Sequence, residues 1–223
     1  MKIIAHRGAS RELPENTMAA FERALEIGVD GIETDLLLTK DRRIVVRHDD
    51  FVRHRGKWCF IRDLTLKEVR SVDLCGERIP LFEEFFDRFS EECELFLDLK
   101  SHGLAAPLAA LLKKRKHSNA VHVTSFIDTE IRRMTTLYPD AERSLAFTAL
   151  TPGWDRALKA CRAKALSLYR GYLTKEQALQ LKKKHIALRV YPVNIPAEAK
   201  RLRAWGVEGI FTDDPRVMKG LEK

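Results

Sequence analysis

The chain has 223 residues, of which 45% are hydrophobic and 32% charged, a composition typical of a globular protein with a buried core. No apolar run approaches the roughly 20 residues that cross a bilayer, and the three apolar residues between Lys2 and His6 are too few for a secretory signal. The net charge is +8, but much of the basic surplus lies in 113–117 and 182–185, at the ends of predicted helices, where cations complement the helix dipole. We therefore expect a cytoplasmic protein with no nucleic-acid partner and no stable membrane insertion.

Cysteine usage agrees with a reducing compartment. None of the four cysteines forms a C-x-x-C pair, so a zinc knuckle or a redox motif is not expected. A chain of this length folds without disulfides, and we expect four free thiols.

Strand-like and helix-like segments alternate along the whole chain. Strands are predicted at 2–6, 31–35, 95–99, 121–124, 144–147, 165–169, 187–193 and 209–212, and helices at 17–28, 81–90, 104–116, 128–137, 154–163, 174–185, 197–205 and 215–221. Eight strands alternating with eight helices predict a single α/β domain over 1–223, a (β/α)8 TIM barrel. A doubly wound open sheet is the alternative, but the G-x-G-x-x-G turn that often marks it is absent. The similarity of 28–35 to 206–213 supports a repeated unit.

One segment, about 36–80, interrupts this alternation after the second strand. Its first part predicts a hairpin that turns near Asp41 and brings His48 back to the level of Glu33. The remainder, with one short helix near 66–72, is predicted to form a small cap or rim over the active face.

Three carboxylates are predicted to meet at the carboxyl ends of neighbouring strands. Glu33 and Asp35 are two residues apart on one strand, so they share a face with their Cα atoms about 7 Å apart. Asp98 ends the next strand, and Lys100 follows it. Three oxygen ligands favour a hard divalent cation, Ca²⁺ or Mg²⁺, over zinc.

Two histidines are predicted to lie beside these carboxylates. His6 ends the first strand and His48 ends the returning arm of the hairpin. Two imidazoles can remove one proton and supply another, as the cleavage of a phosphodiester requires. Arg7 and Lys100 are placed to bind the charged phosphate oxygens.

Other strand ends receive more modest predictions. Phe126, Tyr191 and Asn194 are candidates for lining the part of the site that holds the unreactive portion of a substrate. Ser125 lacks a G-x-S-x-G elbow, so a serine hydrolase is not expected. Asp213 precedes Asp214-Pro215, and we interpret this run as helix capping.

Together, His6-Arg7-Gly8, Pro14-Glu15-Asn16-Thr17, Glu33-x-Asp35, His48-Asp49, Asp98-Leu99-Lys100 and Thr212-Asp213-x-Pro215 resemble the motifs of the glycerophosphodiester phosphodiesterases. The resemblance spans nearly the whole chain and implies a TIM barrel of the phospholipase C-like phosphodiesterase type. It implies hydrolysis of glycerophosphodiesters to sn-glycerol 3-phosphate and an alcohol with a divalent cation. By position it implies that His6 and His48 are catalytic, that Glu33 and Asp35 bind metal, and that Arg7, Lys100 and Glu15 contact the substrate.

The sequence departs from the family pattern at two places. Asp98 stands where the family usually has a glutamate, and Tyr191-Pro192-Val193-Asn194 stands where it tends to have Trp-Thr-Val-Asn. Two alternative functions remain open. One is a lysophospholipase D, with Trp58 and Phe60 as candidates for an acyl-chain groove. The other is a barrel that binds anions without catalysis.

Overall fold

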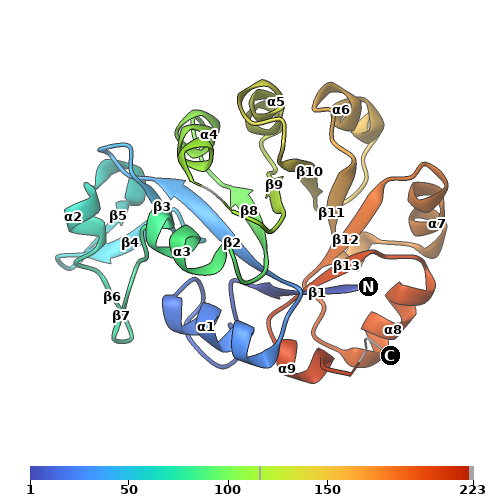
Figure 1. Ribbon diagram of the computed structural model, residues 1–223, viewed down its shortest axis with the longest axis horizontal. Helices are drawn as coiled ribbons and strands as arrows, with labels where there is room; N and C mark the ends of the chain where they lie inside the picture. The colour runs from blue at the N-terminus through green and yellow to red at the C-terminus, as the bar shows by residue number, and fades with distance from the viewer. Residues whose placement is uncertain (116, 221–223) are drawn as a thin grey trace.

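The computed structural model describes residues 1–115 and 117–220. Its eight parallel strands close into a barrel, because β1 hydrogen-bonds to both β13 and β2. The barrel strands are β1 (Lys2–His6), β2 (Gly31–Leu38), β8 (Glu94–Leu99), β9 (Val121–Thr124), β10 (Glu142–Phe147), β11 (Ala165–Tyr169), β12 (Ala187–Tyr191) and β13 (Gly209–Thr212). Figure 1 shows the helices arranged around these strands. The predicted fold class, a TIM barrel, is confirmed.

A helix follows each barrel strand. These helices are α1 (Met18–Ile27), α3 (Phe82–Phe89), α4 (Ala105–Lys114), α5 (Asp128–Leu137), α6 (Trp154–Ala160), α7 (Lys175–Lys183), α8 (Pro196–Ala204) and α9 (Pro215–Met218). The predicted capping box of α7 is present: Gln177 donates its backbone N–H to Thr174 and accepts the backbone N–H of Thr174 in return. Lys116 and Leu221, which the sequence places at two helix ends, lie outside the described residues.

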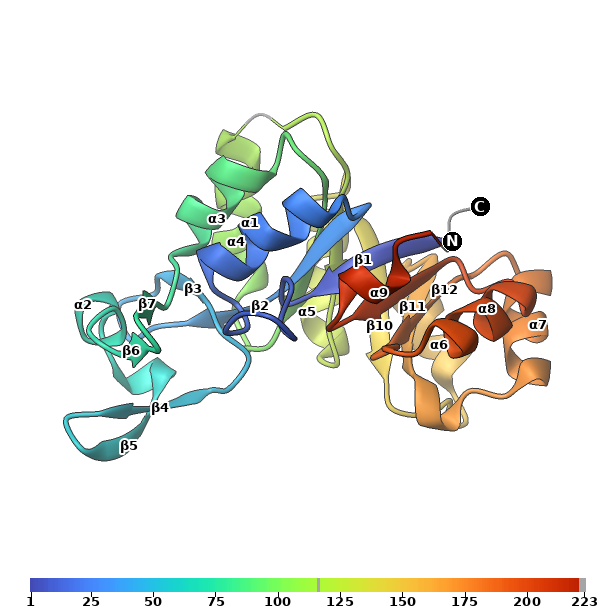
Figure 2. The same cartoon turned by 90° about the horizontal axis from the view of Figure 1, so that it is seen from below.

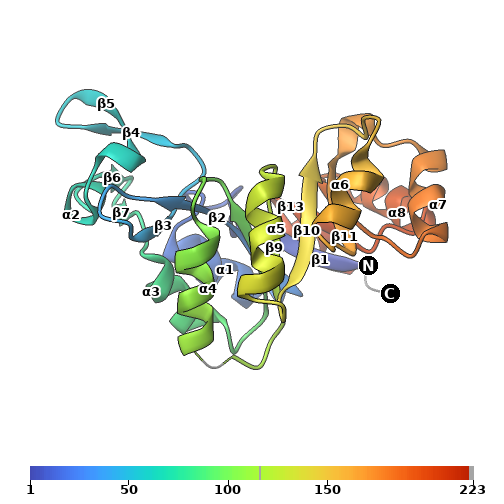
Figure 3. The same ribbon diagram turned by 90° about the horizontal axis from the view of Figure 1, so that it is seen from above.

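The segment between β2 and α3 forms a structure of its own beside the barrel. Strand β3 (Ile44–Val46) pairs antiparallel with β2, as the predicted hairpin requires. Beyond it lie hairpin β4–β5 (Phe51–His54 and Lys57–Phe60), η1 (Ile61–Asp63), α2 (Leu66–Val69) and hairpin β6–β7 (Asp73–Leu74 and Glu77–Arg78). A separate apolar cluster that includes Val45, Val52, Ile61 and Val69 holds these elements together. They extend to one side of the barrel, at the left of Figure 3.

Hydrophobic packing accounts for most of the fold, and none of the described helices is long and apolar enough to cross a membrane. The main apolar cluster fills the space between barrel and helices, where Phe21 of α1 meets the rings of Phe85 and Phe89 of α3 edge-on. All four cysteines are free.

A network of charged side chains lies near the amino ends of the strands. Arg189 of β12 is only 1% exposed, and its guanidinium binds Glu142 of β10 and lies 5.0 Å from the centre of the Phe96 ring. The His122 ring stacks on the same Phe96 ring and bonds to both Glu142 and Glu94. Burial of the arginine costs little only while its carboxylate partner is present.

The charged network predicts a pH-dependent stability. Burial raises the pKa of Glu142, but the hydrogen bond from His122 and the charge of Arg189 outweigh it and lower the pKa to about 2. An ordinary glutamate titrates near pH 4.3, so this stabilisation is complete above about pH 4.5 and is lost as the pH falls toward about 2. The free energy of unfolding, measured in urea, should fall more steeply from neutral to acid pH for the native chain than for Glu142→Gln.

Arg189→Ala should lower the free energy of unfolding by about 3 kcal/mol at neutral pH, because it removes the ion pair with half-buried Glu142 and leaves a cavity beside the Phe96 ring. The matched control is Arg201→Ala on α8, whose ion pair with Glu198 is on the surface. It should cost no more than about 1 kcal/mol. Equal losses in the two variants would contradict a structural role for the network.

Candidate active site

A cavity of about 530 Å³ opens at the carboxyl ends of the barrel strands. Its charged lining comes from β1, β2, β8 and the segment after β3 and consists of His6, Arg7, Glu33, Asp35, His48, Asp98 and Lys100. Its aromatic lining includes Phe126, Tyr169, Tyr172 and Tyr191, which follow or end β9, β11 and β12. In the barrel these two sets of strands face each other, so the cavity has a charged side and an aromatic side.

The three predicted carboxylates meet on the charged side. Strands β2 and β8 pair in a register that sets Asp35 beside Asp98, and Glu33 is two residues earlier on the same face as Asp35. Each of Glu33, Asp35 and Asp98 offers one oxygen within 4.8 Å of those of the other two. All three side chains are buried, and Oδ1 of Asp98 has no hydrogen-bond partner among the described residues.

The electrostatics of this acidic triad favour a bound cation. Burial and the neighbouring charge of Asp35 raise the pKa of Glu33 well above its usual value. Burial also raises the pKa of Asp98, to about 7. Buried carboxylates this close repel each other, and a cation would remove the repulsion while satisfying Oδ1 of Asp98. The donor set therefore fits a divalent cation.

The His6-Arg7-Gly8 turn places the guanidinium against the acidic triad. Arg7 and Gly8 both have positive φ values, of 60° and 83°, and a Cβ on Gly8 would lie 2.7 Å from the backbone of Ala20 in α1. The backbone N–H of Arg7 donates to Glu33 at 3.0 Å, and its Nε lies 3.1 Å from Asp35. The turn requires a glycine because a side chain would collide with the helix.

Residues 14–17 support this turn. Glu15 accepts from Nη1 of Arg7 at 2.8 Å, and Asn16 donates from Nδ2 to Asp35 at 3.0 Å. Thr17 caps α1 by accepting the N–H of Ala20. The predicted substrate residue Glu15 therefore contacts Arg7 and is not part of the cavity lining.

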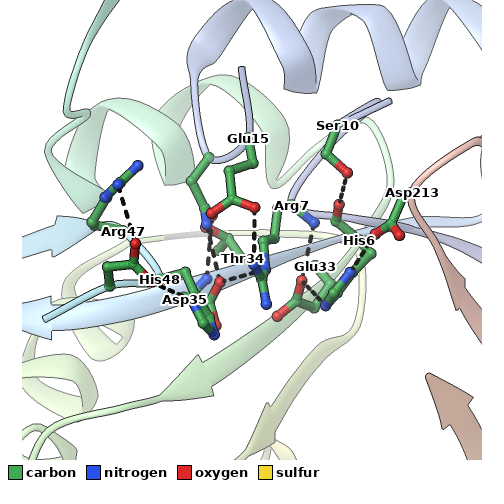
Figure 4. Close-up of polar contacts among 12 residues, drawn as sticks. His6, Arg7, Ser10, Glu15, Glu33, Thr34, Asp35, Arg47, His48 and Asp213 are labelled. Carbon is green, nitrogen blue, oxygen red and sulfur yellow. Dashed lines mark hydrogen bonds and ion pairs between the residues drawn. The ribbon is translucent and has the colours of Figure 1, made fainter. Parts of the chain in front are cut away.

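Both predicted catalytic histidines line the cavity, and each has a carboxylate at its Nδ1. Nδ1 of His6 lies 2.7 Å from Asp213, and Nδ1 of His48 lies 2.9 Å from Asp49. An ionised carboxylate only accepts hydrogen bonds, so Nδ1 carries the proton in each ring. This leaves Nε2 of each ring unprotonated in the neutral form, and in His6 it lies 4.0 Å from Glu33. Figure 4 shows both rings with Arg7, the β2 carboxylates and Asp213.

Asp213 is a site residue that our sequence interpretation assigned only to capping. Burial raises its pKa, but hydrogen bonds from His6 and Asn194 outweigh this and lower it, so the carboxylate is ionised. Asn194 donates to it at 2.6 Å and accepts from its backbone N–H at 2.9 Å. Asn194, predicted to line the site, thus contacts Asp213 and is not part of the cavity lining. Asn16, which our sequence interpretation placed only within the 14–17 motif, is a second such contact, because it donates to Asp35.

The remaining predicted lining residues, Phe126 and Tyr191, lie on the aromatic side. Their rings are perpendicular with centres 6.4 Å apart, and the Tyr191 hydroxyl donates to the carbonyl of Phe147. The centre of the Tyr169 ring lies 6.1 Å from that of Tyr191. This side of the cavity can hold an apolar group next to an anion bound by Arg7 and Lys100.

Comparisons with known proteins agree with this geometry. The sequence model described as the glycerophosphoryl diester phosphodiesterase family matches residues 6–217. A glycerophosphodiester phosphodiesterase of Caldanaerobacter subterraneus subsp. tengcongensis is 34% identical, and the match covers 98% of this chain and 96% of that protein. A lysophospholipase D of Homo sapiens is 32% identical over 52% of this chain and 43% of its own length.

Among solved structures, a phosphodiesterase of Oleispira antarctica in complex with the product sn-glycerol-3-phosphate superposes with a TM-score of 0.92. It is 24% identical, and the match covers 100% of this chain and 97% of that one. This likeness supports the barrel fold.

Proposed function

Because the chain belongs to the glycerophosphoryl diester phosphodiesterase family, we propose that it hydrolyses small glycerophosphodiesters to sn-glycerol 3-phosphate and an alcohol, as a cytoplasmic single-domain enzyme. The observation that carries this proposal is the meeting of two histidines, two cationic side chains and three buried carboxylates in one cavity. A barrel that only binds anions would have no use for an acidic triad beside the anion. The charge pattern therefore favours catalysis.

Arg7 and Lys100 would hold the phosphate. Nζ of Lys100, which follows β8, lies 3.5 Å from Asp35 and 3.6 Å from Asp98. Nε of Arg7, which follows β1, lies 3.1 Å from Asp35. Both cations therefore border the acidic triad, where a phosphate can bind them while its remaining charge faces a bound cation. Their charges would also stabilise the negative charge that develops on the oxygens in the transition state.

His6 and His48 would move the protons. Nε2 of one imidazole takes the proton from the attacking hydroxyl as the new P–O bond forms, and the other imidazolium protonates the oxygen of the departing alcohol as its P–O bond breaks. If water attacks, glycerol 3-phosphate forms directly; if a glycerol hydroxyl attacks, the cyclic phosphate that forms is opened by water, with the two rings in exchanged roles. Asp213 and Asp49 hold the rings in the tautomer that exposes Nε2. The protons balance, because in each P–O cleavage one ring takes up a proton from the attacking hydroxyl and the other gives one to the departing oxygen.

Glu33, Asp35 and Asp98 would hold the divalent cation, which we propose to be Ca²⁺ or Mg²⁺, since oxygen ligands select hard cations. When bound, the cation supplies Lewis-acid stabilisation of phosphate charge. Asp98 keeps a free oxygen for it, and Asn16 fixes the orientation of Asp35. Asp98 is one methylene shorter than glutamate, but the β2–β8 register already brings it level with Asp35.

The experiment that tests this function is a headgroup panel. Glycerophosphocholine, glycerophosphoethanolamine and glycerophosphoglycerol are assayed for released glycerol 3-phosphate with and without added Ca²⁺ or Mg²⁺. We expect cation-dependent release from at least one of them. Absence of glycerol 3-phosphate from every member, with either cation present, would overturn the proposal.

A second candidate, a lysophospholipase D, is favoured by the aromatic side of the cavity. Phe126 and Tyr172 are more than half exposed at its edge, where an acyl chain could lie. A relative of that name matches half of the chain. Comparing lysophosphatidylcholine with glycerophosphocholine separates the two functions, since only the first would yield lysophosphatidic acid.

Asp213→Asn tests the positioning of His6. The amide can donate to Nδ1, which favours the wrong tautomer, so kcat should fall by about 100-fold while KM changes little. Asp214→Asn is the matched control, because the neighbouring side chain does not contact His6 in the described structure. Asp213→Glu should recover part of kcat. Equal kcat values in Asp213→Asn and the native chain would contradict this role.

A further inference from the structure

Hairpin β4–β5 has one buried and one exposed face. In its antiparallel register Phe51 faces Phe60 and Arg53 faces Trp58. Val52 points the other way, is 3% exposed and packs into the apolar cluster of the insertion. Phe51, Arg53, Trp58 and Phe60 form the other face, and all four are exposed. We call it the aromatic face.

The aromatic face carries large rings in water. Trp58 is 71% exposed, and Phe51 and Phe60 are each more than 40% exposed. The Phe51 and Trp58 rings meet edge-on with centres 5.4 Å apart, so they form one apolar surface. Single exposed rings are ordinary, but three gathered on one small hairpin indicate a surface that something covers.

The charge of the hairpin is entirely positive. From Phe51 to Phe60 it has three cations (Arg53, Arg55 and Lys57) and no acidic residue; Arg62 follows in η1, and Asp50 and Asp63 flank the segment. Within the described residues, no ion pair to a carboxylate neutralises Arg53 or Lys57, whereas the guanidinium of Arg88 on α3 is paired with Glu22; several exposed lysines, such as those of α7, are unpaired too. Arg62 lies 4.3 Å from the centre of the Phe60 ring. The occupant must therefore be negatively charged as well as apolar.

We propose that hairpin β4–β5 docks the protein reversibly on the surface of an anionic lipid bilayer. Tryptophan and phenylalanine enter the boundary between headgroups and acyl chains, while arginine and lysine bind anionic headgroups. A second copy of this chain fits poorly, because equivalent hairpins would bring three cations against three cations.

The hairpin is close in the chain to the cavity, so docking would affect where the cavity lies. It projects from the body of the molecule as an arm, as Figures 2 and 3 show. Its first residue, Phe51, follows His48 of the cavity by three residues. Docking would thus hold the cavity close to the lipid surface. The proposal itself does not depend on the chemistry in the cavity, and its test uses no substrate.

The test is co-sedimentation of the full chain with two kinds of vesicle, phosphatidylcholine alone and phosphatidylcholine mixed with phosphatidylglycerol. We expect binding to the mixed vesicles only, and weaker binding as salt rises. Arg53→Gln with Lys57→Gln should weaken binding on the order of 25-fold, since each cation near the surface contributes on the order of fivefold. Trp58→Ser with Phe60→Ser should weaken it at least as much.

Matched controls separate docking from general charge. Lys182→Gln with Lys183→Gln removes the same charge from the end of α7, and Leu179→Ser removes an exposed apolar side chain from the same helix. Both should bind as the native chain does. The altered hairpin residues are exposed, so thermal melting should confirm that every variant is folded.

Three outcomes would overturn the proposal: no binding to the mixed vesicles, equal losses in hairpin and control variants, or tighter binding to a single-stranded oligonucleotide than to the vesicles. The last would assign the aromatic face to nucleic acid.

Discussion

His6→Ala and His48→Ala are each expected to lower kcat by about 10²- to 10⁴-fold, the range that general acid–base catalysis contributes. Each variant removes one of the two proton carriers, while Arg7, Lys100 and the acidic triad still hold the substrate. KM should therefore change far less than kcat. The measurement is steady-state release of glycerol 3-phosphate by variants whose melting temperature matches that of the native chain.

His185→Ala serves as the control for this pair, because His185 lies just beyond the end of α7, away from the cavity. Its kcat should equal that of the native chain. A rate close to the native value in His6→Ala or His48→Ala would refute the two-histidine mechanism.

Removal of divalent cations is expected to lower activity by about 10²- to 10³-fold, because Lewis-acid stabilisation of a phosphoryl transition state amounts to several kcal/mol. Ca²⁺ or Mg²⁺ should restore the activity. A second readout needs no substrate. The cation relieves the repulsion among Glu33, Asp35 and Asp98, so its addition should raise the melting temperature.

Asp35→Asn should abolish that rise in melting temperature together with the activity, since it removes a buried ligand charge. Asp41→Asn, at the far end of the β2–β3 hairpin, is the control and should keep both. Full activity in the presence of a chelator, or a melting temperature that does not respond to either cation, would contradict the metal role.

Much of the barrel could be predicted because its strands and helices are determined by patterns of neighbouring residues in the sequence. Alternating strand and helix patterns, cap residues such as Thr17 and Thr174, and glycines at helix ends each act over a few residues. The acidic triad was also predictable, because Glu33 and Asp35 share a strand face and Asp98 ends the next strand of the barrel. The register of β2 and β8 then brings the three carboxylates together.

Asp213 was missed because its role depends on barrel closure. It lies 207 residues after His6, and the two meet only because β13 pairs with β1 in a register that sets Thr212 beside Ala5. A signal existed. The repeat that aligns 28–35 with 206–213 sets Asp213 at the position of Asp35, which marks it as a residue at the cavity end of its strand.

The insertion was the hardest part to predict. Strands β4, β5, β6 and β7 have two to four residues each, too short for a clear alternation pattern. The prediction placed this segment over the active face. In the structure its elements after His48 pack against the outer side of the β2–β3 hairpin, and none of the residues that line the described cavity comes from 49–80.

The most direct test of the whole account is ³¹P relaxation of glycerol 3-phosphate bound to the protein in the presence of Mn²⁺. If the acidic triad, Arg7 and the two histidines surround one phosphate, the paramagnetic ion should broaden the bound phosphorus signal strongly. The broadening should disappear in Asp35→Asn and remain in Asp41→Asn. If glycerol 3-phosphate binds to the native protein and its ³¹P signal is not broadened by Mn²⁺, the cation and the phosphate occupy separate sites, which would contradict the account.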